Sequence, residues 1–139
     1  MKLRVVWVGK TKSPYLAKLC EDYIIRIRHF LSLEIAEVRE AKILAAMDRS
    51  DRVVALDPGG MAWTSEGFAK FIQQHMTSDP RRLTFVIGDY AGLSDEVKQR
   101  ADVSWSLSPL TFTHDLTRIL LLEQLYRALS IIKNLPYAK

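Results

Sequence analysis

Three short segments of the sequence place glycine or small polar residues directly after an apolar run, at residues 56–60, 87–92 and 107–112. Glycine lets the backbone approach a ligand closely, although most glycines after strands only make turns. None of the segments has the glycine pattern of a dinucleotide-binding loop or a P-loop. The sequence therefore disfavours those two classes of enzyme and leaves the segments as candidate loops for another ligand.

The other reactive side chains are isolated. The histidines, His29, His75 and His114, lack the spacing typical of metal ligands, so we expect no metal site. Ser108 and His114 lack the Gly-x-Ser-x-Gly context of a serine nucleophile. Cys20 is the only cysteine, which excludes an intrachain disulfide, and we expect it to pack as a small buried apolar residue.

The elements that must position these segments follow from the apolar pattern. Runs of β-branched and aromatic residues predict strands, and apolar residues three or four apart predict amphipathic helices. We expect strands at residues 3–8, 33–38, 52–57, 83–87 and 103–107. We expect helices from Pro14 to Leu31 with Ser13 as N-cap, at 41–47, after Ser65 as N-cap, after Ser94, and at 112–132.

Strands that alternate with helices, without a tight hairpin signal, are typical of parallel sheets. The predicted fold is therefore α/β, with a mostly parallel sheet of five or six strands, helices on both faces and a single domain over residues 1–139. The carboxyl ends of parallel strands share one edge of the sheet, where ligands bind in open α/β proteins. Because each of the three segments follows a predicted strand, we expect them to converge at that edge.

The last predicted helix is apolar almost all the way round, whereas a helix that lies on a sheet needs one apolar stripe. Its apolar residues are Leu116, Ile119, Leu120, Leu121, Leu122, Leu125, Ala128, Leu129, Ile131 and Ile132. We expect this helix to be buried on more than one side, most simply in a two-fold homodimer. The alternative is a central helix that its own domain surrounds.

Charge and hydropathy restrict the partners. The chain has 20 Lys and Arg against 16 Asp and Glu, a net charge of +4, which favours a polyanionic partner without requiring one. The longest aliphatic run, 119–122, is far shorter than a membrane span, and the first residues have no secretory signal pattern. We therefore expect no membrane association and a cytoplasmic location.

Several segments carry a resemblance to a known family. They are residues 85–88, 104–108 with Leu110 and Thr111, then His114, Leu116 and Arg118, the stretch 121–128, and the ending Pro136-Tyr137. With Leu56-Asp57 and residues 65–69, the sequence resembles the RlmH (YbeA-like) family over its whole length. Members of that family are ribosomal large-subunit pseudouridine N3-methyltransferases of the SPOUT superfamily.

The resemblance implies a SPOUT fold whose C-terminal part forms a trefoil knot, and a homodimer with the active site at its interface. It also implies S-adenosylmethionine as methyl donor and, as substrate, a pseudouridine in 23S ribosomal RNA, presented on the assembled ribosome. By position in the motifs, the cofactor would contact Leu56, Gly88, Leu107, Ser108, Pro109, Leu110, Thr111 and Phe112. These residues fall in the three segments found from the glycine pattern.

The acceptor N3 carries a proton that must leave as the methyl group arrives, so the site needs a base or a cation. Our candidates are Arg127 and Tyr137 as catalytic residues, with Lys139 as a further substrate contact. Arg127 has a structural alternative, since Glu123 lies four residues earlier on the same helix. Phosphate contacts could come from basic residues elsewhere in the chain: Arg4, Lys10, Lys12, Arg81, Arg82 and Lys133.

Two positions depart from the family's pattern. Asp89 stands where a second glycine is common, and Ala138 stands where the ending Pro-Tyr-His is common. These departures leave open a non-enzymatic dimeric RNA-binding module with the same fold, and a small-molecule methyltransferase is a third alternative. Methyl transfer to ribosomes, or to free nucleosides, distinguishes the three.

Overall fold

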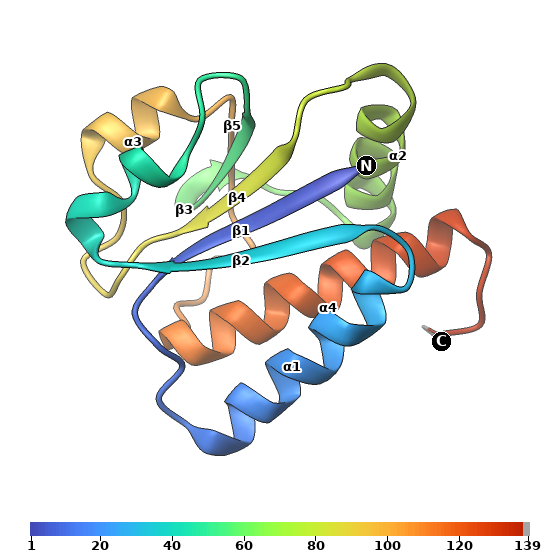
Figure 1. Ribbon diagram of the computed structural model, residues 1–139, viewed down its shortest axis with the longest axis horizontal. Helices are drawn as coiled ribbons and strands as arrows, with labels where there is room; N and C mark the ends of the chain where they lie inside the picture. The colour runs from blue at the N-terminus through green and yellow to red at the C-terminus, as the bar shows by residue number, and fades with distance from the viewer. Residues whose placement is uncertain (138–139) are drawn as a thin grey trace.

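In residues 1–137, which the computed structural model describes, five parallel strands form one sheet in the order β2-β1-β4-β3-β5 (Figure 1). The strands are β1 (Lys2–Val8), β2 (Ser32–Val38), β3 (Arg52–Met61), β4 (Leu83–Ile87) and β5 (Val103–Trp105). The helices are α1 (Pro14–Arg28), α2 (Ser65–Ser78), α3 (Asp95–Arg100) and α4 (His114–Ile132), with 3-10 turns η1 (Glu40–Lys42) and η2 (Leu44–Ala46). The predicted α/β fold with a parallel sheet is confirmed. The trefoil knot and the single-domain boundary stay predictions.

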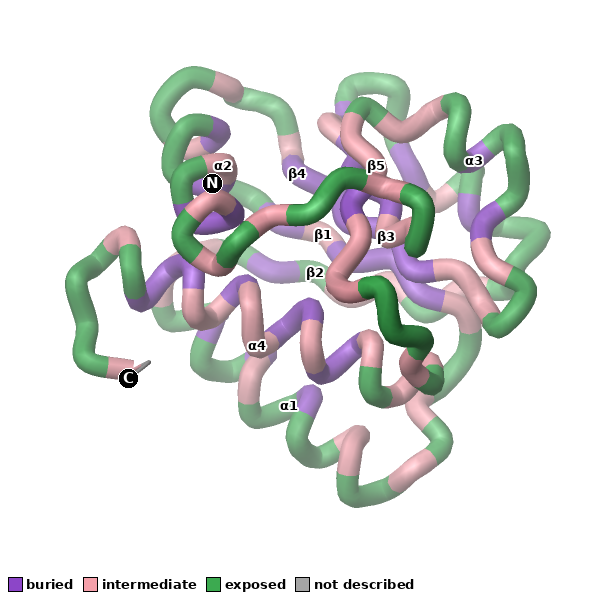
Figure 2. The backbone as a smooth tube through the Cα atoms, turned by 180° about the vertical axis from the view of Figure 1, so that it is seen from behind, coloured by how far each residue is buried: buried purple, intermediate pink, exposed green. Residues whose placement is uncertain are grey.

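Both faces of the sheet are covered, as predicted. One core cluster joins β-strand side chains such as Phe85 and Trp105 to α1, α2 and α4. The second cluster joins Val53, Val86 and their neighbours to Ile43, which lies between η1 and η2, and to η2 and α3 on the opposite face. Burial is concentrated along the strands and on α4 (Figure 2). The central strand β4 is buried at every residue, which explains why all of its residues but Thr84 are apolar.

Two helix starts differ from the prediction by a residue or two. α2 is capped by Thr64, whose hydroxyl accepts from Gly67 N at 3.0 Å, whereas Ser65 donates to Gln124 of α4. α4 begins at His114, after Thr113, whose hydroxyl accepts from Leu116 N. At α2 two neighbouring residues, Thr64 and Ser65, can cap, and the tertiary contact of Ser65 leaves Thr64 as the cap.

The largest difference lies at β3, which was expected to end at Asp57. Leu56 and Met61 both pair with Trp105 of β5, so residues 57–60 form an irregular loop inside the strand. Gly60 lies so close to β5 that a Cβ there would come within 2.5 Å of the Ser104 carbonyl carbon. β5 correspondingly ends at Trp105, two residues earlier than expected, because the chain turns there to form the wall of a cavity described below.

α4 is surrounded within its own chain. Leu121 and Leu125 are 0% and 1% exposed, and α4 packs against the sheet, α1 and α2. The alternative of a central helix is therefore the one this chain adopts for most of α4. A less buried stripe remains, and it contains Leu116, Leu120 and Ile131. This stripe is the part of α4 that we consider as a surface for a partner.

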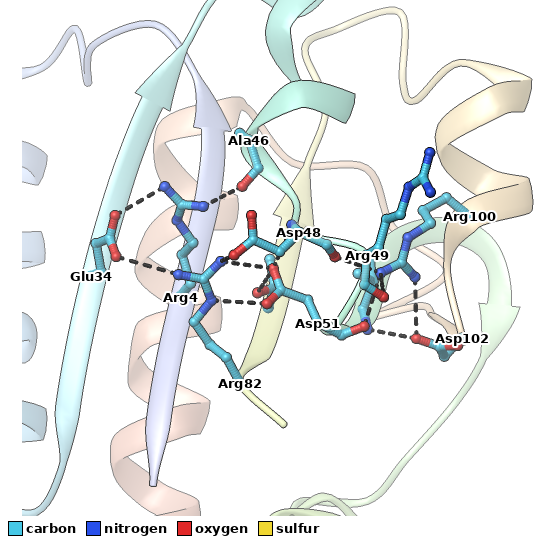
Figure 3. A network of polar contacts seen from close by, with 11 residues as sticks. Arg4, Glu34, Ala46, Asp48, Arg49, Asp51, Arg82, Arg100 and Asp102 are labelled. Atoms are coloured by element: carbon cyan, nitrogen blue, oxygen red, sulfur yellow. Dashed lines mark hydrogen bonds and ion pairs between the residues drawn. The ribbon is translucent and has the colours of Figure 1, made fainter. Parts of the chain in front are cut away.

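A polar network fixes one edge of the sheet to the turn before β3 (Figure 3). Asp51 is 2% exposed and accepts hydrogen bonds from Arg82, Thr84 and the backbone of Asp48. Burial raises the pKa of this carboxyl, but its hydrogen bonds, first of all that from Arg82, outweigh burial and hold the pKa below its ordinary value of 3.8. Asp51 is therefore ionised, and its partners depend on that charge.

Replacing Asp51 with alanine is expected to lower the free energy of unfolding by about 2–3 kcal/mol, because Arg82 and Thr84 lose a buried partner. Urea denaturation at neutral pH measures the loss. The wild-type protein should lose this contribution as the pH falls below about 4, since its folded-state pKa lies below the unfolded one. Asp51→Asn should show a flatter pH dependence in that range. An unchanged dependence would contradict the assignment.

Candidate active site

The three predicted loops meet at the carboxyl edge of the sheet, as expected. A cavity of about 200 Å³ lies between the ends of β3, β4 and β5 and the first turn of α4. Of the eight residues assigned to cofactor binding, seven line it: Leu56, Gly88, Leu107, Ser108, Leu110, Thr111 and Phe112. Pro109 lies between two of them in sequence but does not line the cavity. What the cavity binds stays a prediction.

The loop after β4 is held in place by its own side chains. The Asp89 carboxylate accepts from Ala91 N at 2.9 Å, and the Asp89 carbonyl accepts from Gly92 N at 2.8 Å. Gly92 has φ +81°, which favours glycine. Asp89, the departure from the family's pattern, thus builds the turn. It leaves Gly88 and Gly92 at the wall of the cavity.

The absence of a side chain at Gly88 also leaves room for the loop that follows it. A Cβ at Gly88 would lie 2.8 Å from the Gly92 backbone and 2.9 Å from the Leu93 side chain. The space is therefore occupied by the loop itself, and glycine is needed there for the loop to fold back on β4. A side chain at position 88 would deform the cavity wall indirectly.

The loop after β5 forms the opposite wall. Ser106 donates to the Ser108 carbonyl at 3.0 Å, and the Ser108 hydroxyl accepts from Leu110 N at 3.0 Å. Ser108 is thus used to shape the turn, which fits its lack of a nucleophile's context. Leu110 is 71% exposed at the rim.

The chemistry of the cavity fits a cationic or neutral ligand. Asp57 and Asp89 line it, and no lysine or arginine does among the lining residues in the described part of the chain. A ligand recognised through phosphate groups would need donors or cations there. Leucine side chains on two walls, with backbone polar groups between them, suit a flat apolar ring, and the carboxylates suit a sulfonium. The site therefore fits S-adenosylmethionine.

Arg127 and Tyr137 lie at the other end of α4. Thr117 lines the cavity, and ten residues of helix separate it from Arg127, about 15 Å along the axis. Arg127 pairs with Glu123 at 3.0 Å, the structural alternative foreseen from their spacing. This pairing raises the pKa of Arg127 further, so the guanidinium stays charged. One chain therefore does not bring the proposed catalytic residues to the cavity.

Tyr137 packs edge-on against the Tyr126 ring, with centroids 4.7 Å apart, and its hydroxyl lies 2.9 Å from Glu123 Oε2 and 2.8 Å from the Tyr23 hydroxyl. With one proton to give, Tyr137 donates to Glu123 and accepts from Tyr23. Burial and these hydrogen bonds raise the pKa of Tyr137 above its usual range, so the phenol is neutral near pH 7. It is arranged as a hydrogen-bond donor and not as a base. Lys139 and Ala138 lie outside the described residues.

Cys20 is buried, as expected from the sequence. Burial raises the pKa of the Cys20 thiol to about 11, which makes it unreactive at neutral pH. No group of histidine, cysteine and acidic side chains in residues 1–137 could hold a metal ion. No helix in the same residues is long and apolar enough to cross a membrane.

A family model described as predicted SPOUT methyltransferase matches residues 1–138. The chain belongs to the SPOUT methyltransferase family. Curated proteins named ribosomal RNA large subunit methyltransferase H match this SPOUT chain over its full length. That of Geobacter sulfurreducens is 40% identical over 151 residues, 99% of each chain, and that of Coprothermobacter proteolyticus is 39% identical over 139 residues, 100% of each chain.

Solved structures of methyltransferases are similar to this chain in fold. A probable methylase family protein from Haemophilus influenzae aligns with a TM-score of 0.67 at 12% identity, covering 99% of this chain and 70% of that one. The SpoU methyltransferase AviRb from Streptomyces viridochromogenes, in complex with the cofactor AdoMet, aligns with a TM-score of 0.53 at 16% identity, covering 91% of this chain and 57% of that one. At these identities the likeness shows the fold alone.

Sequence reasoning missed several cavity residues. Tyr90, Trp105 and Thr117 line it, and so does His114, which the sequence analysis did not assign to the cofactor. Thr117 follows His114 by one helical turn, a spacing that could have placed both at the cavity once the helix start was fixed. Nothing in the sequence alone points Trp105 toward the ligand, because a strand-end tryptophan is usually core.

Proposed function

We propose that this protein transfers a methyl group from S-adenosylmethionine to N3 of a pseudouridine in 23S ribosomal RNA, on the assembled ribosome and in the cytoplasm. The observation that carries the proposal is the cation-free cavity at the carboxyl edge of the sheet, lined by the loops that hold the family's motifs. The full-length relatives named as large-subunit ribosomal RNA methyltransferases support the RNA substrate.

When bound, S-adenosylmethionine supplies a methyl group already activated on a sulfonium. The protein's task is then to align the acceptor and manage its proton. The N3 proton of the uracil ring passes to solvent water, and the charged Arg127 guanidinium stabilises the anionic ring that accepts the methyl group. Tyr137, a neutral phenol, donates a hydrogen bond to a ring carbonyl or keeps Glu123 in place beside Arg127.

We further propose a homodimer with a composite site. The separation of about 15 Å between the cavity and Arg127 along α4 means that one chain supplies only half of the machinery. The less buried stripe of α4 runs from Leu116 through Leu120 to Ile131 and includes Arg127. A two-fold axis across the middle of this stripe would set Arg127 of the partner subunit beside the first turns of α4, where the cavity opens.

Replacing Leu116, 42% exposed on that stripe, with glutamate is expected to dissociate the dimer, because the partner would have to bury the new charge. Sedimentation velocity measures the assembly, and circular dichroism checks that the monomer stays folded. Tyr15→Glu, on an 87% exposed residue at the start of α1, serves as the matched control and should leave the assembly unchanged. A dimer that survives Leu116→Glu would place the interface elsewhere.

The proposed function is tested by calorimetry with S-adenosylmethionine, followed by transfer of a tritiated methyl group to ribosomes whose pseudouridine is unmethylated. We expect binding and transfer, with the label at N3. Binding without transfer would favour the non-enzymatic RNA-binding module. Transfer to free nucleosides would favour a small-molecule methyltransferase.

A further inference from the structure

A second cavity, of about 590 Å³, adjoins the candidate cofactor pocket. It lies between the loop after β1 and the first turn of α4, and it shares Tyr90, Phe112 and His114 with the pocket. We propose that this groove holds the single-stranded RNA next to the target nucleotide, with Lys10 and Lys12 on backbone phosphates and Tyr90 stacked on a base. The inference rests on the proposed function and adds where the RNA strand runs.

The charges separate the two cavities. The cofactor pocket has no lysine or arginine among its described lining residues, whereas Lys10, Lys12 and Arg118 line the groove. A cationic groove attracts a polyanion, and phosphate contacts set the position of a nucleic acid without reading its sequence.

The structure also distinguishes among the basic residues that could contact phosphate. Arg4 pairs with Glu34 at 3.0 Å and Arg82 with Asp51 at 2.9 Å, both inside the network of Figure 3, and Arg81 pairs with Asp79 at 2.7 Å. Lys133 follows the end of α4 that, within one chain, lies away from this groove. Lys10 and Lys12 are exposed, and within residues 1–137 neither forms an ion pair. They are therefore available to an external anion.

The loop that carries the two lysines is fastened to α4. The Asp115 carboxylate accepts from the backbone N–H groups of Lys12 at 3.1 Å and Ser13 at 2.9 Å. Arg118, 2% exposed, donates to the Val8 carbonyl at 2.6 Å and to the Thr11 hydroxyl at 3.0 Å. The negative charge of Asp115 is thus engaged by the backbone, and the lysines project from a fixed loop.

Tyr90 stands on the boundary between pocket and groove. Its side chain is 91% exposed, an unusual state for a large aromatic residue, while the turn beneath it is fixed by Asp89 and Gly92. Exposed aromatic rings beside cationic grooves are the platforms on which proteins stack unpaired bases. A base that stacks on Tyr90 would lie directly beside the cofactor pocket.

The test uses the full-length protein and a fluorescein-labelled single-stranded RNA of about 20 nucleotides and mixed sequence, followed by anisotropy between about 50 and 200 mM KCl. Lys10→Gln/Lys12→Gln is compared with Lys2→Gln/Lys70→Gln, which removes the same charge from exposed residues of β1 and α2. If each lysine contacts one phosphate, the negative slope of log K against log salt should become shallower by about 1.4 in the first variant. The control should keep the wild-type slope.

The stacking half of the proposal is tested at position 90. Tyr90→Leu should weaken RNA binding about fivefold or more, because leucine offers no ring, whereas Tyr90→Phe should stay within about twofold of wild type. Equal effects of the leucine and phenylalanine variants would overturn the stacking role. Equal slopes in the two lysine variants would overturn the phosphate role.

Two further measurements distinguish a failure of the RNA groove from a failure of the proposed function or a change in self-association. Cofactor affinity of Lys10→Gln/Lys12→Gln, from calorimetry, should match wild type within about twofold, since neither lysine lines the pocket. Failure of the wild-type protein to bind S-adenosylmethionine would refute the proposed function and leave the RNA titrations standing. A changed sedimentation coefficient in the lysine variant would assign the groove to contacts between copies and overturn the proposal.

Discussion

Co-expression of two inactive variants, Arg127→Ala and Gly88→Val, is expected to restore about a quarter of wild-type methyl transfer. Random pairing makes half of the dimers mixed, and each mixed dimer has one intact site of two. Its Arg127→Ala chain supplies a normal pocket, and its Gly88→Val chain supplies Arg127. Differently tagged chains and transfer of a tritiated methyl group to ribosomes measure the recovery.

Each variant alone should be nearly inactive, for different reasons, when the assay holds S-adenosylmethionine well below the dissociation constant of Gly88→Val. Loss of the guanidinium should lower the transfer rate by about 10²–10³-fold, as for other residues that stabilise a developing anion. Valine at position 88 should weaken S-adenosylmethionine binding by about tenfold or more, because its Cβ collides with the Gly92 backbone and moves the pocket wall.

A control co-expression excludes recovery of activity that does not depend on a shared site. Co-expression of Gly88→Val with the double variant Gly88→Val/Arg127→Ala contains the same substitutions but offers no intact pocket in any dimer, and it should stay inactive. If Arg127→Ala and Gly88→Val likewise show no recovery while mixed dimers are isolated, the site is not shared between subunits. In that event Arg127 would act within its own chain or only through its pair with Glu123.

Deletion of residues 137–139 is expected to abolish methyl transfer to ribosomes and to leave cofactor affinity within about a factor of two, less than about 0.5 kcal/mol. The reason is distance, since Tyr137 lies beside Glu123 and Arg127 and none of the three lines the cofactor cavity. Calorimetry and methyl transfer on the same preparation separate the two effects.

Tyr137→Phe serves as the graded control for this deletion. It keeps the ring that packs on Tyr126 and removes only the hydrogen bonds to Glu123 and Tyr23. An intermediate transfer rate would assign part of the effect to the hydroxyl. Loss of cofactor binding in the deletion would show that the tail belongs to the donor site, contrary to the composite arrangement.

The sequence predicts the sheet well because its signals are local. Runs such as Leu83–Ile87 are almost entirely apolar because both of their sides are buried, and the segments after the strands converge because the strands are parallel. The assignment of the cofactor residues came from the motifs at those same segments. Seven of the eight line one cavity, since motif and strand end coincide in this fold.

What the sequence could not predict depends on contacts between distant segments. The irregular end of β3 exists because Gly60 meets the backbone of Ser104, more than forty residues later. The apolar surface of α4 indicated burial on several sides, but only the fold shows that α1 and α2 provide most of it.

The first turn of α4 lies between the two cavities and forms part of the wall of each. His114 lines both, while Asp115, the next residue, holds the backbone of Lys12. A ligand that shifts this turn from one side changes the geometry offered to a ligand on the other. Thermodynamic linkage makes such a coupling reciprocal. If a bound donor raises the affinity for RNA by a given factor, bound RNA raises the affinity for the donor by the same factor. Under the proposed function, the total binding free energy is the same whether the donor or the RNA binds first. The order of binding is then decided by the binding rates alone.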